Sequence, residues 1–296
     1  MKCEVKSIVE LTEVPSASGI EHVGDEYYAI GDNTPWVFVL DRTFQMNSKF
    51  SLGTYTANEG GVMTKSAKHD FEAMTSMKWK GEHWLFIFGS GSKQPYRFEG
   101  KLIDVAKRAV VQTFSLQKFY QLLREEAKLD PEELNIEAAV TLNGKLYLFN
   151  RGKNRIIVAD VDRFMEFISG EAESVKLKSY SIDLPKINEV KAGFSGAVGD
   201  DRNERILFTA SVENTEDWVK DGEILGSFIG VIDVKNLQQH YLPQTIQIKA
   251  KNGKVTFKAE SISIVEGEGD SYKCAVVTDN DGLNSELLEI DLRLQD

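Results

Sequence analysis

The chain has 296 residues, of which 42% are hydrophobic and 10% are aromatic, so it can bury a sizeable core in one large domain or two smaller ones. Its formal net charge is −11, from 46 acidic and 35 basic residues, and the sequence shows neither a basic stripe nor a basic tail. This balance argues against a nucleic-acid or anionic-membrane partner and leaves a small polar or anionic molecule as the expected ligand.

The N-terminal segment, MKCEVKSIVELTEV, alternates charged and apolar residues and lacks the unbroken apolar core of a signal peptide. No apolar run reaches the roughly 18 residues that indicate a membrane-spanning helix. The two cysteines, Cys3 and Cys274, do not form a disulfide framework. We therefore expect a cytoplasmic protein, or a periplasmic one if a leader has been removed.

A four-residue pattern recurs five times along the chain. Its second position is Ser or Glu, and its third position is always a small residue. The five copies are ASGI (17–20), FEAM (71–74), IEAA (136–139), FSGA (194–197) and AESI (259–262). A turn and a second strand-like segment follow each copy, and most copies are also followed by a third such segment. The pattern predicts a repeated unit of short antiparallel strands.

The spacing between successive second positions is 54, 65, 58 and 65 residues. Repeats of this length built from short strands are typical of a β-propeller. The N-terminal strand, residues 3–11, has no unit of its own, whereas the last unit ends after three strands. We therefore predict an all-β fold, a five-bladed β-propeller closed by the N-terminal strand, as a single domain over residues 1–296. A six-bladed ring would need a further repeat, which residues 100–134 could supply.

Two segments interrupt the strand pattern. Residues 115–135, SLQKFYQLLREEAKLDPEELN, carry apolar residues at helical spacing from Leu116 to Leu123. A second helix is expected from an N-cap at Asp162 to a stop at Gly170. We expect both to be short helical insertions on the rim.

The first strand of each blade lines the channel of a propeller, and its start lies at the same end of the blade as the end of the second strand. The second positions of the repeat should therefore meet in one central funnel, which would bring Glu72, Glu137 and Glu260 together with Ser18 and Ser195. Strand ends and neighbouring loops add polar candidates for ligand binding, namely Asp32, Asn33, His69, Lys93, Asn150, Arg151, Glu213, Asp279 and Asn280.

Three carboxylates near one axis repel each other unless raised pKa values, basic partners or a bound cation compensate. Oxygen ligands suit Ca²⁺, and the four histidines are too scattered for a His-rich transition-metal site. Glu72, Glu137 and Glu260 are therefore candidate ligands for Ca²⁺ or another divalent cation, and candidate catalytic residues. The alternative is structural: these glutamates accept hydrogen bonds from the backbone of the adjacent blade.

Other segments reach the same funnel. NRGKNR (150–155) and GSGSKQPYR (89–97) carry basic residues that could hold a phosphate or a carboxylate, or could be ordinary solvated loops. We expect the long segment 210–226 to hang over the funnel, as a lid, as an acidic wall or as a disordered rim. No GxSxG elbow is present, and GSGSK lacks the spacing of a Walker A loop.

Three stretches, ASGIEHVGDEYYAIGDN, NIEAAVTLNGKLYLFNRGKNR and AESISIVEGEGDSYKCAVVTDND, resemble the propeller family called esterase-like activity of phytase and the related SdiA-regulated propellers. In this resemblance the three glutamates match the acidic position of the inner strand, and Asp32 and Asp279 match the acidic end of the second strand. The chain departs from the pattern at Ser18 and Ser195, where an acidic residue could stand.

Two functions remain open. The first is a propeller that binds a small polar ligand or a divalent cation at an acidic central funnel. The second, which the resemblance implies, is a metal-assisted hydrolase that acts on a phosphoester, as a phytase does, or on a lactone.

Overall fold

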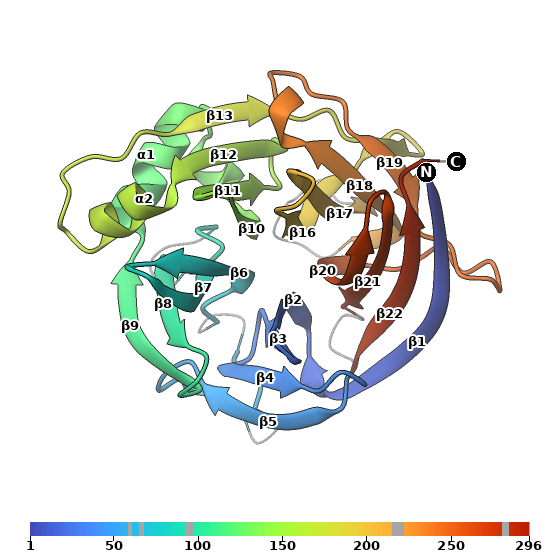
Figure 1. Cartoon of the computed structure of the whole chain (residues 1–296), viewed down its shortest axis with the longest axis horizontal. Coiled ribbons are helices and arrows are strands. Elements are labelled where there is room, and N and C mark those ends of the chain that lie inside the picture. The colour runs from blue at the N-terminus through green and yellow to red at the C-terminus, as the bar shows by residue number, and fades with distance from the viewer. Residues whose placement is uncertain (59–60, 65–67, 93–96, 215–221, 280–283, 296) are drawn as a thin grey trace.

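A computed structural model describes the chain except for residues 59–60, 65–67, 93–96, 215–221, 280–283 and 296. Its described part contains five four-stranded antiparallel sheets, which are arranged around a central axis (Figure 1). The predicted five-bladed β-propeller is therefore confirmed. The segment that a sixth blade would have used, residues 100–134, instead forms strands of the second blade and the helices that follow them.

Each blade is numbered here from its innermost to its outermost strand. Blade 1 contains β2 (Ala17–Val23), β3 (Glu26–Gly31), β4 (Trp36–Leu40) and β5 (Met46–Ser51); blade 2 contains β6 (Phe71–Trp79), β7 (Glu82–Gly89), β8 (Glu99–Asp104) and β9 (Ala109–Ser115). Blade 3 contains β10 (Ile136–Leu142), β11 (Lys145–Asn150), β12 (Arg155–Asp160) and β13 (Lys178–Ser181). Blade 4 contains β16 (Gly193–Asp200), β17 (Arg205–Asn214), β18 (Glu223–Asp233) and β19 (Gln244–Gln247).

Blade 5 joins the two ends of the chain. Its inner three strands are β20 (Ala259–Glu268), β21 (Ser271–Thr278) and β22 (Asn284–Arg293), and its outermost strand is β1 (Lys2–Pro15). The β1–β22 pairing runs from Lys2 opposite Arg293 to Pro15 opposite Asn284. Figure 1 shows both termini at this blade. The predicted closure by the N-terminal strand is confirmed, and the backbone hydrogen bonds of this pairing hold the first and last blades of the ring together.

One helical insertion follows blade 2 and the other lies between β12 and β13 of blade 3, with two corrections to their bounds. The first segment is split into α1 (Gln117–Ala127) and a 3₁₀ turn, η1 (Pro131–Glu133), because Lys128 adopts a left-handed conformation with φ of 54°. The second helix is α2 (Val161–Ile168), and its N-cap is Asp160 rather than Asp162, because Asp160 accepts a hydrogen bond from the backbone of Arg163. Neither helix has the length or the apolar run that crossing a bilayer requires.

Three shorter elements complete the described chain: β14 (Lys186–Ile187), β15 (Val190–Lys191) and the 3₁₀ turn η2 (Val234–Asn236).

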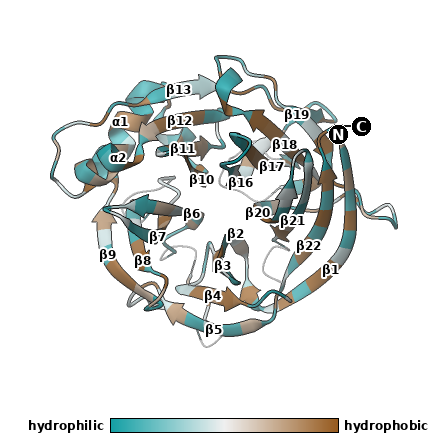
Figure 2. Cartoon of the chain, viewed as in Figure 1, coloured by the Kyte–Doolittle hydropathy of each residue, from teal (hydrophilic) through white to brown (hydrophobic). Residues whose placement is uncertain are grey.

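The apolar core lies between neighbouring blades, where the faces of adjacent sheets meet. Phe86 of blade 2 and Phe119 of α1 both pack on Phe164 of α2, with ring centroids 5.5 and 4.8 Å apart. In Figure 2 the outer strand β1 alternates hydrophobic and hydrophilic residues, as expected for a strand with one buried face.

Every inner strand contains a β-bulge at the second position of the repeat. The pairing register of each inner strand with its neighbour skips one residue at this point, and the skipped residues are Ser18, Glu72, Glu137, Ser195 and Glu260. A bulged residue is left out of the ladder and its side chain is redirected. The sequence repeat therefore marks a backbone feature that presents one side chain per blade.

The small third position of the repeat follows from close contact between blades. A Cβ atom on Gly196 would lie 2.4 Å from the Cα of Ser261 in the inner strand of the next blade. Only glycine allows this approach at position 196, beside the bulge of β16.

Candidate functional site

The three glutamates of the repeat converge near the axis, although they lie in three different blades. Burial raises the pKa of each, to about 7 for Glu137 and well above the usual value for Glu72 and Glu260. The charge of Glu137 further raises the pKa values of Glu72 and Glu260. Ion pairs link Glu137 to Glu260, because Arg151 lies near Glu137 and Glu213 while Lys258 lies near Glu213 and Glu260. The predicted convergence of the repeat glutamates is thus what the structure shows.

Charged side chains from all five blades surround these glutamates. We call this set the central cluster; its acidic members are Asp32, Asp70, Glu72, Glu137, Glu213, Glu260 and Asp279, and its basic members are Lys68, Arg97, Arg151 and Lys258.

Arg151, which follows β11, is a basic group that interacts with four glutamates of the cluster. Its Nη2 donates to Oε1 of Glu213 at 2.9 Å, and its Nη1 lies 3.9 Å from Oε2 of Glu137. Burial acts to lower its pKa, but the charges of Glu213, Glu137, Glu260 and Glu72 together raise it above the usual value. Gly193 leaves room for this side chain, since a Cβ there would lie 2.6 Å from the Cγ of Arg151.

Lys258, immediately before β20, forms ion pairs with the two acidic residues that blade 5 contributes to the cluster. Its Nζ lies 3.3 Å from Glu260 and 3.3 Å from Asp279, and 3.9 Å from Glu213 of blade 4. The amino group therefore balances part of the buried charge of Glu260, whose side chain is only 8% exposed.

Lys68 and Arg97 provide the positive charges on the opposite side of the cluster. Lys68 pairs with Asp32 of blade 1 and, at 2.7 Å, with Asp70, which directly precedes β6. Asp70 also accepts from Arg97, Ser90 and Ser92. Burial acts to raise the pKa of Asp70, but Lys68 and Arg97 bring it below the usual value. The pKa of Asp32 is raised, chiefly by burial and further by Asp70 and Asp279.

Glu72 differs from the other two repeat glutamates because, among the described residues, its carboxyl group forms no hydrogen bond or ion pair. Glu137 accepts from the side chain of Asn135 at 2.5 Å, and Glu260 pairs with Lys258. Glu72 offers an oxygen that lies, with those of Asp32 and Asp70, in a group whose members are all within 4.8 Å of one another. Hard cations such as Ca²⁺ favour this donor set, although Lys68 already contacts two of the three carboxylates.

The serines of the repeat bond to protein groups. Ser18 donates to the carbonyl oxygen of Phe71 at 2.6 Å and so links blades 1 and 2, whereas Ser195 donates to Thr209 at 3.1 Å within blade 4. The structural alternative for the three glutamates was a hydrogen bond from the backbone of the adjacent blade. Glu21 makes such a bond instead, since it accepts from the backbone N–H of Ser76 at 3.1 Å. The sequence reasoning missed Glu21, although a charged residue inside an inner strand was a usable signal.

The other predicted site residues have different surroundings. Asn33 donates to Ser16 at 2.8 Å, close to the cluster. Asn150 is fully buried, accepting from the backbone of Asn135 and donating to that of Glu133, so it holds a loop in place. His69 lies 3.2 Å from Glu99, in a group with Tyr55 and Lys101 that is separate from the contacts described above. Lys93, Asn280 and most of the expected lid, residues 215–221, fall outside the described residues.

Two further members of the cluster, Asp70 and Lys258, were not singled out from the sequence as site residues. Each occupies the position directly before a copy of the repeat, as Asn135 does before the third copy. A polar residue at this position in four of the five copies was the signal that could have identified them.

A family model described as "Family of unknown function (DUF6929)" matches residues 13–292. A search of curated proteins gives no match. Among solved structures, glutaminyl cyclase from Myxococcus xanthus aligns with a TM-score of 0.53 and 10% identity over 99% of this chain and 97% of that one. A GH43 β-1,3-galactosidase aligns with a TM-score of 0.52 and 11% identity over 97% of this chain and 60% of that one.

At such low identity these structural likenesses support the propeller fold and nothing finer. Both neighbours are named as enzymes, but neither is a phytase and the family description names none, so the phytase-like assignment is not confirmed. The match over residues 13–292 covers nearly the whole sequence. The chain therefore belongs to the DUF6929 family.

Proposed function

We propose that the central cluster is a binding site for a small polar molecule and that Glu72 is the residue that contacts it. The observation that carries this proposal is the Glu72 carboxyl group, which is redirected toward the cluster by a β-bulge and has no partner among the described residues. A mostly buried polar group without a partner is costly, and a ligand that bonds to it removes that cost.

The charges of the cluster favour a neutral or cationic ligand. Counted over the described residues, the cluster contains seven carboxyl groups and four basic groups, a difference of three. The raised pKa values of Glu72, Glu137 and Glu260 favour their neutral form, which would remove that excess. A protonated Glu72 can donate to a carbonyl or hydroxyl oxygen, and an ionised Glu72 can accept from an amine.

An anionic ligand is less favourable because the basic groups already have carboxylate partners. Lys68, Arg97, Arg151 and Lys258 each lie within ion-pair distance of at least one acid. An anion would have to displace one of these pairs, leaving a buried carboxylate without its cation. The proposed ligand is therefore a polyol, an amine or an amino acid rather than a phosphate.

The test is a thermal-shift and calorimetric screen of glycerol, glucose, putrescine and glycine against the wild-type protein, Glu72→Gln and Glu82→Gln. Glu82 is an exposed residue at the other end of the β6–β7 hairpin, so its variant is a matched control. We expect a ligand of this set to bind the wild type and Glu82→Gln, with weaker binding to Glu72→Gln. Equal binding to all three proteins would contradict the proposal.

The second candidate is a divalent-cation site that supports hydrolysis of a phosphoester or a lactone. Its support is the group formed by Asp32, Asp70 and Glu72, whose oxygens lie within 4.8 Å of one another, together with the resemblance to the phytase-type propellers. A cation bound there would polarise a scissile bond and lower the pKa of a bound water. Lys68 would have to move aside, since its amino group already contacts Asp32 and Asp70.

Titration of the chelator-treated protein with CaCl₂, followed by an assay with p-nitrophenyl phosphate and a simple lactone, separates the two candidates. Stoichiometric Ca²⁺ binding and turnover that are both lost in Glu72→Gln would favour the hydrolase. Ligand binding that is unchanged by the chelator would favour the binding protein.

A further inference from the structure

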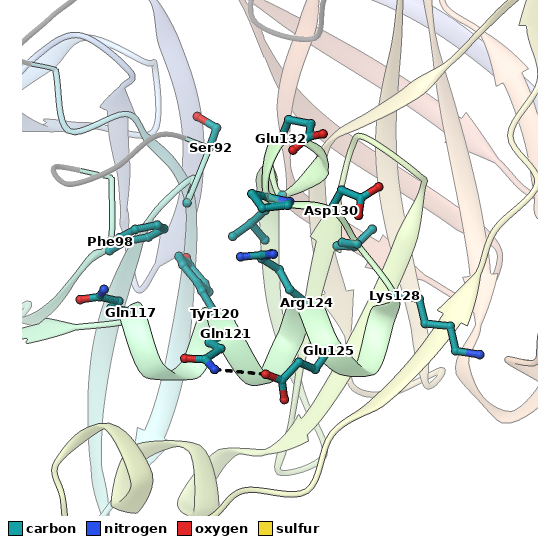
Figure 3. Close-up of a pocket in the computed structure, with 14 residues that line it drawn as sticks. Ser92, Phe98, Gln117, Tyr120, Gln121, Arg124, Glu125, Lys128, Asp130 and Glu132 are labelled. Atoms are coloured by element: carbon teal, nitrogen blue, oxygen red, sulfur yellow. Dashed lines mark hydrogen bonds between the residues drawn. The ribbon is translucent and has the colours of Figure 1, made fainter.

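A second pocket lies on the rim of the propeller, beside α1 and the chain that leads into blade 3 (Figure 3). Its volume is about 800 Å³, within the range of roughly 300–1,000 Å³ that is common for ligand pockets. It is lined by residues of α1, by Phe98 before β8, and by the segment from Lys128 to Leu134. None of the predicted site residues that the structure describes lines it.

Arg124 lines this pocket with a guanidinium group that no described residue pairs with. Its Nε is buried without an acceptor, and across the described residues its guanidinium group forms no hydrogen bond or ion pair. Figure 3 shows the guanidinium pointing toward Tyr120, whereas Lys128 on the next turn points away from it. Because a guanidinium carries five N–H donors in a rigid plane, a group of this kind beside a pocket is suited to an oxyanion from outside the protein.

The acids that line the same pocket are engaged elsewhere or exposed. Glu125 accepts from the side-chain amide of Gln121 at 3.1 Å, the dashed line in Figure 3. Asp130 begins the 3₁₀ turn η1, where its backbone N–H donates to Oε2 of Glu133 at 2.8 Å, and its side chain is exposed. Glu132 is exposed. The pocket therefore keeps a free guanidinium although acidic residues are close to it in the sequence.

Aromatic side chains form a fixed apolar wall beside Arg124. Tyr120 and Phe98 meet edge to face with ring centroids 5.9 Å apart, and the Tyr120 hydroxyl donates to the carbonyl oxygen of Gly89 at 2.6 Å. Gly91 has φ of +74°, and a Cβ there would lie 2.8 Å from Leu134 and 2.9 Å from Tyr120. Since these contacts fix the ring of Tyr120, the wall is preformed for a flat apolar group.

We propose that this pocket binds a small organic carboxylate. Arg124 pairs with the carboxylate through two parallel N–H···O bonds, and the apolar body of the ligand packs on Tyr120 and Phe98. A monoanion fits better than a phosphate dianion, because Glu125, Asp130 and Glu132 add negative charge around a single free guanidinium.

The pocket is a site separate from the central cluster, although one residue, Ser92, contacts both. Ser92 lines the pocket, and its hydroxyl donates to Asp70 of the cluster at 3.1 Å. The proposal for Arg124 does not require a ligand at Glu72, so Glu72→Gln serves as a control that leaves the pocket intact.

The test is titration of the full-length protein with benzoate, benzamide and phenyl phosphate, followed by calorimetry and by ligand-observed NMR. Benzamide has the shape of benzoate without its charge, so it isolates the ion pair. We expect saturable binding of benzoate by the wild type, weaker binding of phenyl phosphate and no measurable binding of benzamide.

The variants are Arg124→Gln, Arg124→Lys and Lys118→Gln, the last an exposed residue of α1 that does not line the pocket. We expect benzoate affinity to fall at least about tenfold in Arg124→Gln, to be intermediate in Arg124→Lys, and to be unchanged in Lys118→Gln and Glu72→Gln. Circular dichroism checks that each variant folds, and Arg124→Lys carries the comparison if Arg124→Gln does not fold. Equal affinity of benzoate for all variants, equal binding of benzoate and benzamide, or no saturable binding of benzoate up to about 10 mM overturns the proposal.

Discussion

Arg151 of blade 3 donates through Nη2 to Oε1 of Glu213 of blade 4 at 2.9 Å, with side chains that are 10% and 12% exposed. This ion pair crosses the boundary between two blades beside the bulged residues of the inner strands. A buried pair of this kind adds little net stability by itself, but loss of one partner leaves the other charge buried and unpaired.

Replacing Arg151 with methionine should therefore destabilise the protein. The change leaves Glu213 without its hydrogen-bonded cation and removes the guanidinium near Glu137, so we expect the free energy of unfolding to fall by about 3–5 kcal/mol. Urea unfolding followed by circular dichroism measures the loss. Arg163→Met removes an exposed pair with Glu166 in α2 and should cost less than about 1 kcal/mol. A similar, small loss of unfolding free energy in both variants would show that the buried pair is not needed for stability.

Glu21 should make stability depend on pH. Burial raises its pKa to about 7, although its carboxylate accepts from the backbone and hydroxyl of Ser76. The folded protein then binds this proton more tightly than the unfolded chain does. The stability contributed by the proton is complete below the unfolded pKa of about 4.5 and is lost as the pH rises through about 7.

We therefore expect Glu21→Gln to be more stable relative to wild type at pH 8 than at pH 5, by up to about 3 kcal/mol. Urea unfolding midpoints at both pH values give the difference, and Glu13→Gln, at an exposed position of β1, is the control. Because Glu137 has a similarly raised pKa, only the difference between variant and wild type isolates Glu21. A difference that does not change with pH would contradict this assignment.

Gly196 and Gly199 allow a matched test of inner-strand packing within β16. A Cβ on Gly196 meets the backbone of Ser261 at 2.4 Å, whereas a Cβ on Gly199 meets a side-chain methyl group of Val140 at 3.0 Å. Backbone on a paired strand moves less readily than a side chain, so we expect Gly196→Ala to lower stability by about 1–3 kcal/mol or more and Gly199→Ala to lower it less. Thermal unfolding of both variants checks this order, and the reverse order would count against the close approach of blades 4 and 5.

Lys68 should decide how strongly the group of Asp32, Asp70 and Glu72 attracts a cation. Lys68→Met removes the charge that now contacts two of these carboxylates and leaves three acids within 4.8 Å. We expect the variant to be less stable than wild type in chelator and to gain more stability from added CaCl₂. Differential scanning calorimetry with and without Ca²⁺ measures both effects, with Lys107→Met, an exposed lysine of blade 2, as the control. No added Ca²⁺ stabilisation in Lys68→Met would count against a cation at this group.

Much of the architecture could be predicted from the sequence because it repeats. The five copies of the pattern, the small residue in their third position and the unmatched N-terminal strand led to five blades and their closure, both confirmed by the sheet pairing. The meeting of Glu72, Glu137 and Glu260 followed from the same reasoning, since equivalent positions in a closed ring face one axis. The helix bounds were less accurate, because the left-handed conformation at Lys128 and the capping by Asp160 depend on local geometry.

The partners of those glutamates were decided only by the tertiary structure. Lys68 and His69 are adjacent in the sequence, yet one pairs with Asp32 and Asp70 whereas the other lies against Glu99. Which side chain faces which depends on bulges and on contacts between blades. The unpartnered guanidinium of Arg124 is likewise a result of packing, because the adjacent Glu125 accepts from Gln121 instead. The sequence by itself determined the ring and the positions that face its axis, because periodic patterning is local; the pairing of charges is not local, and only the closed fold decided it.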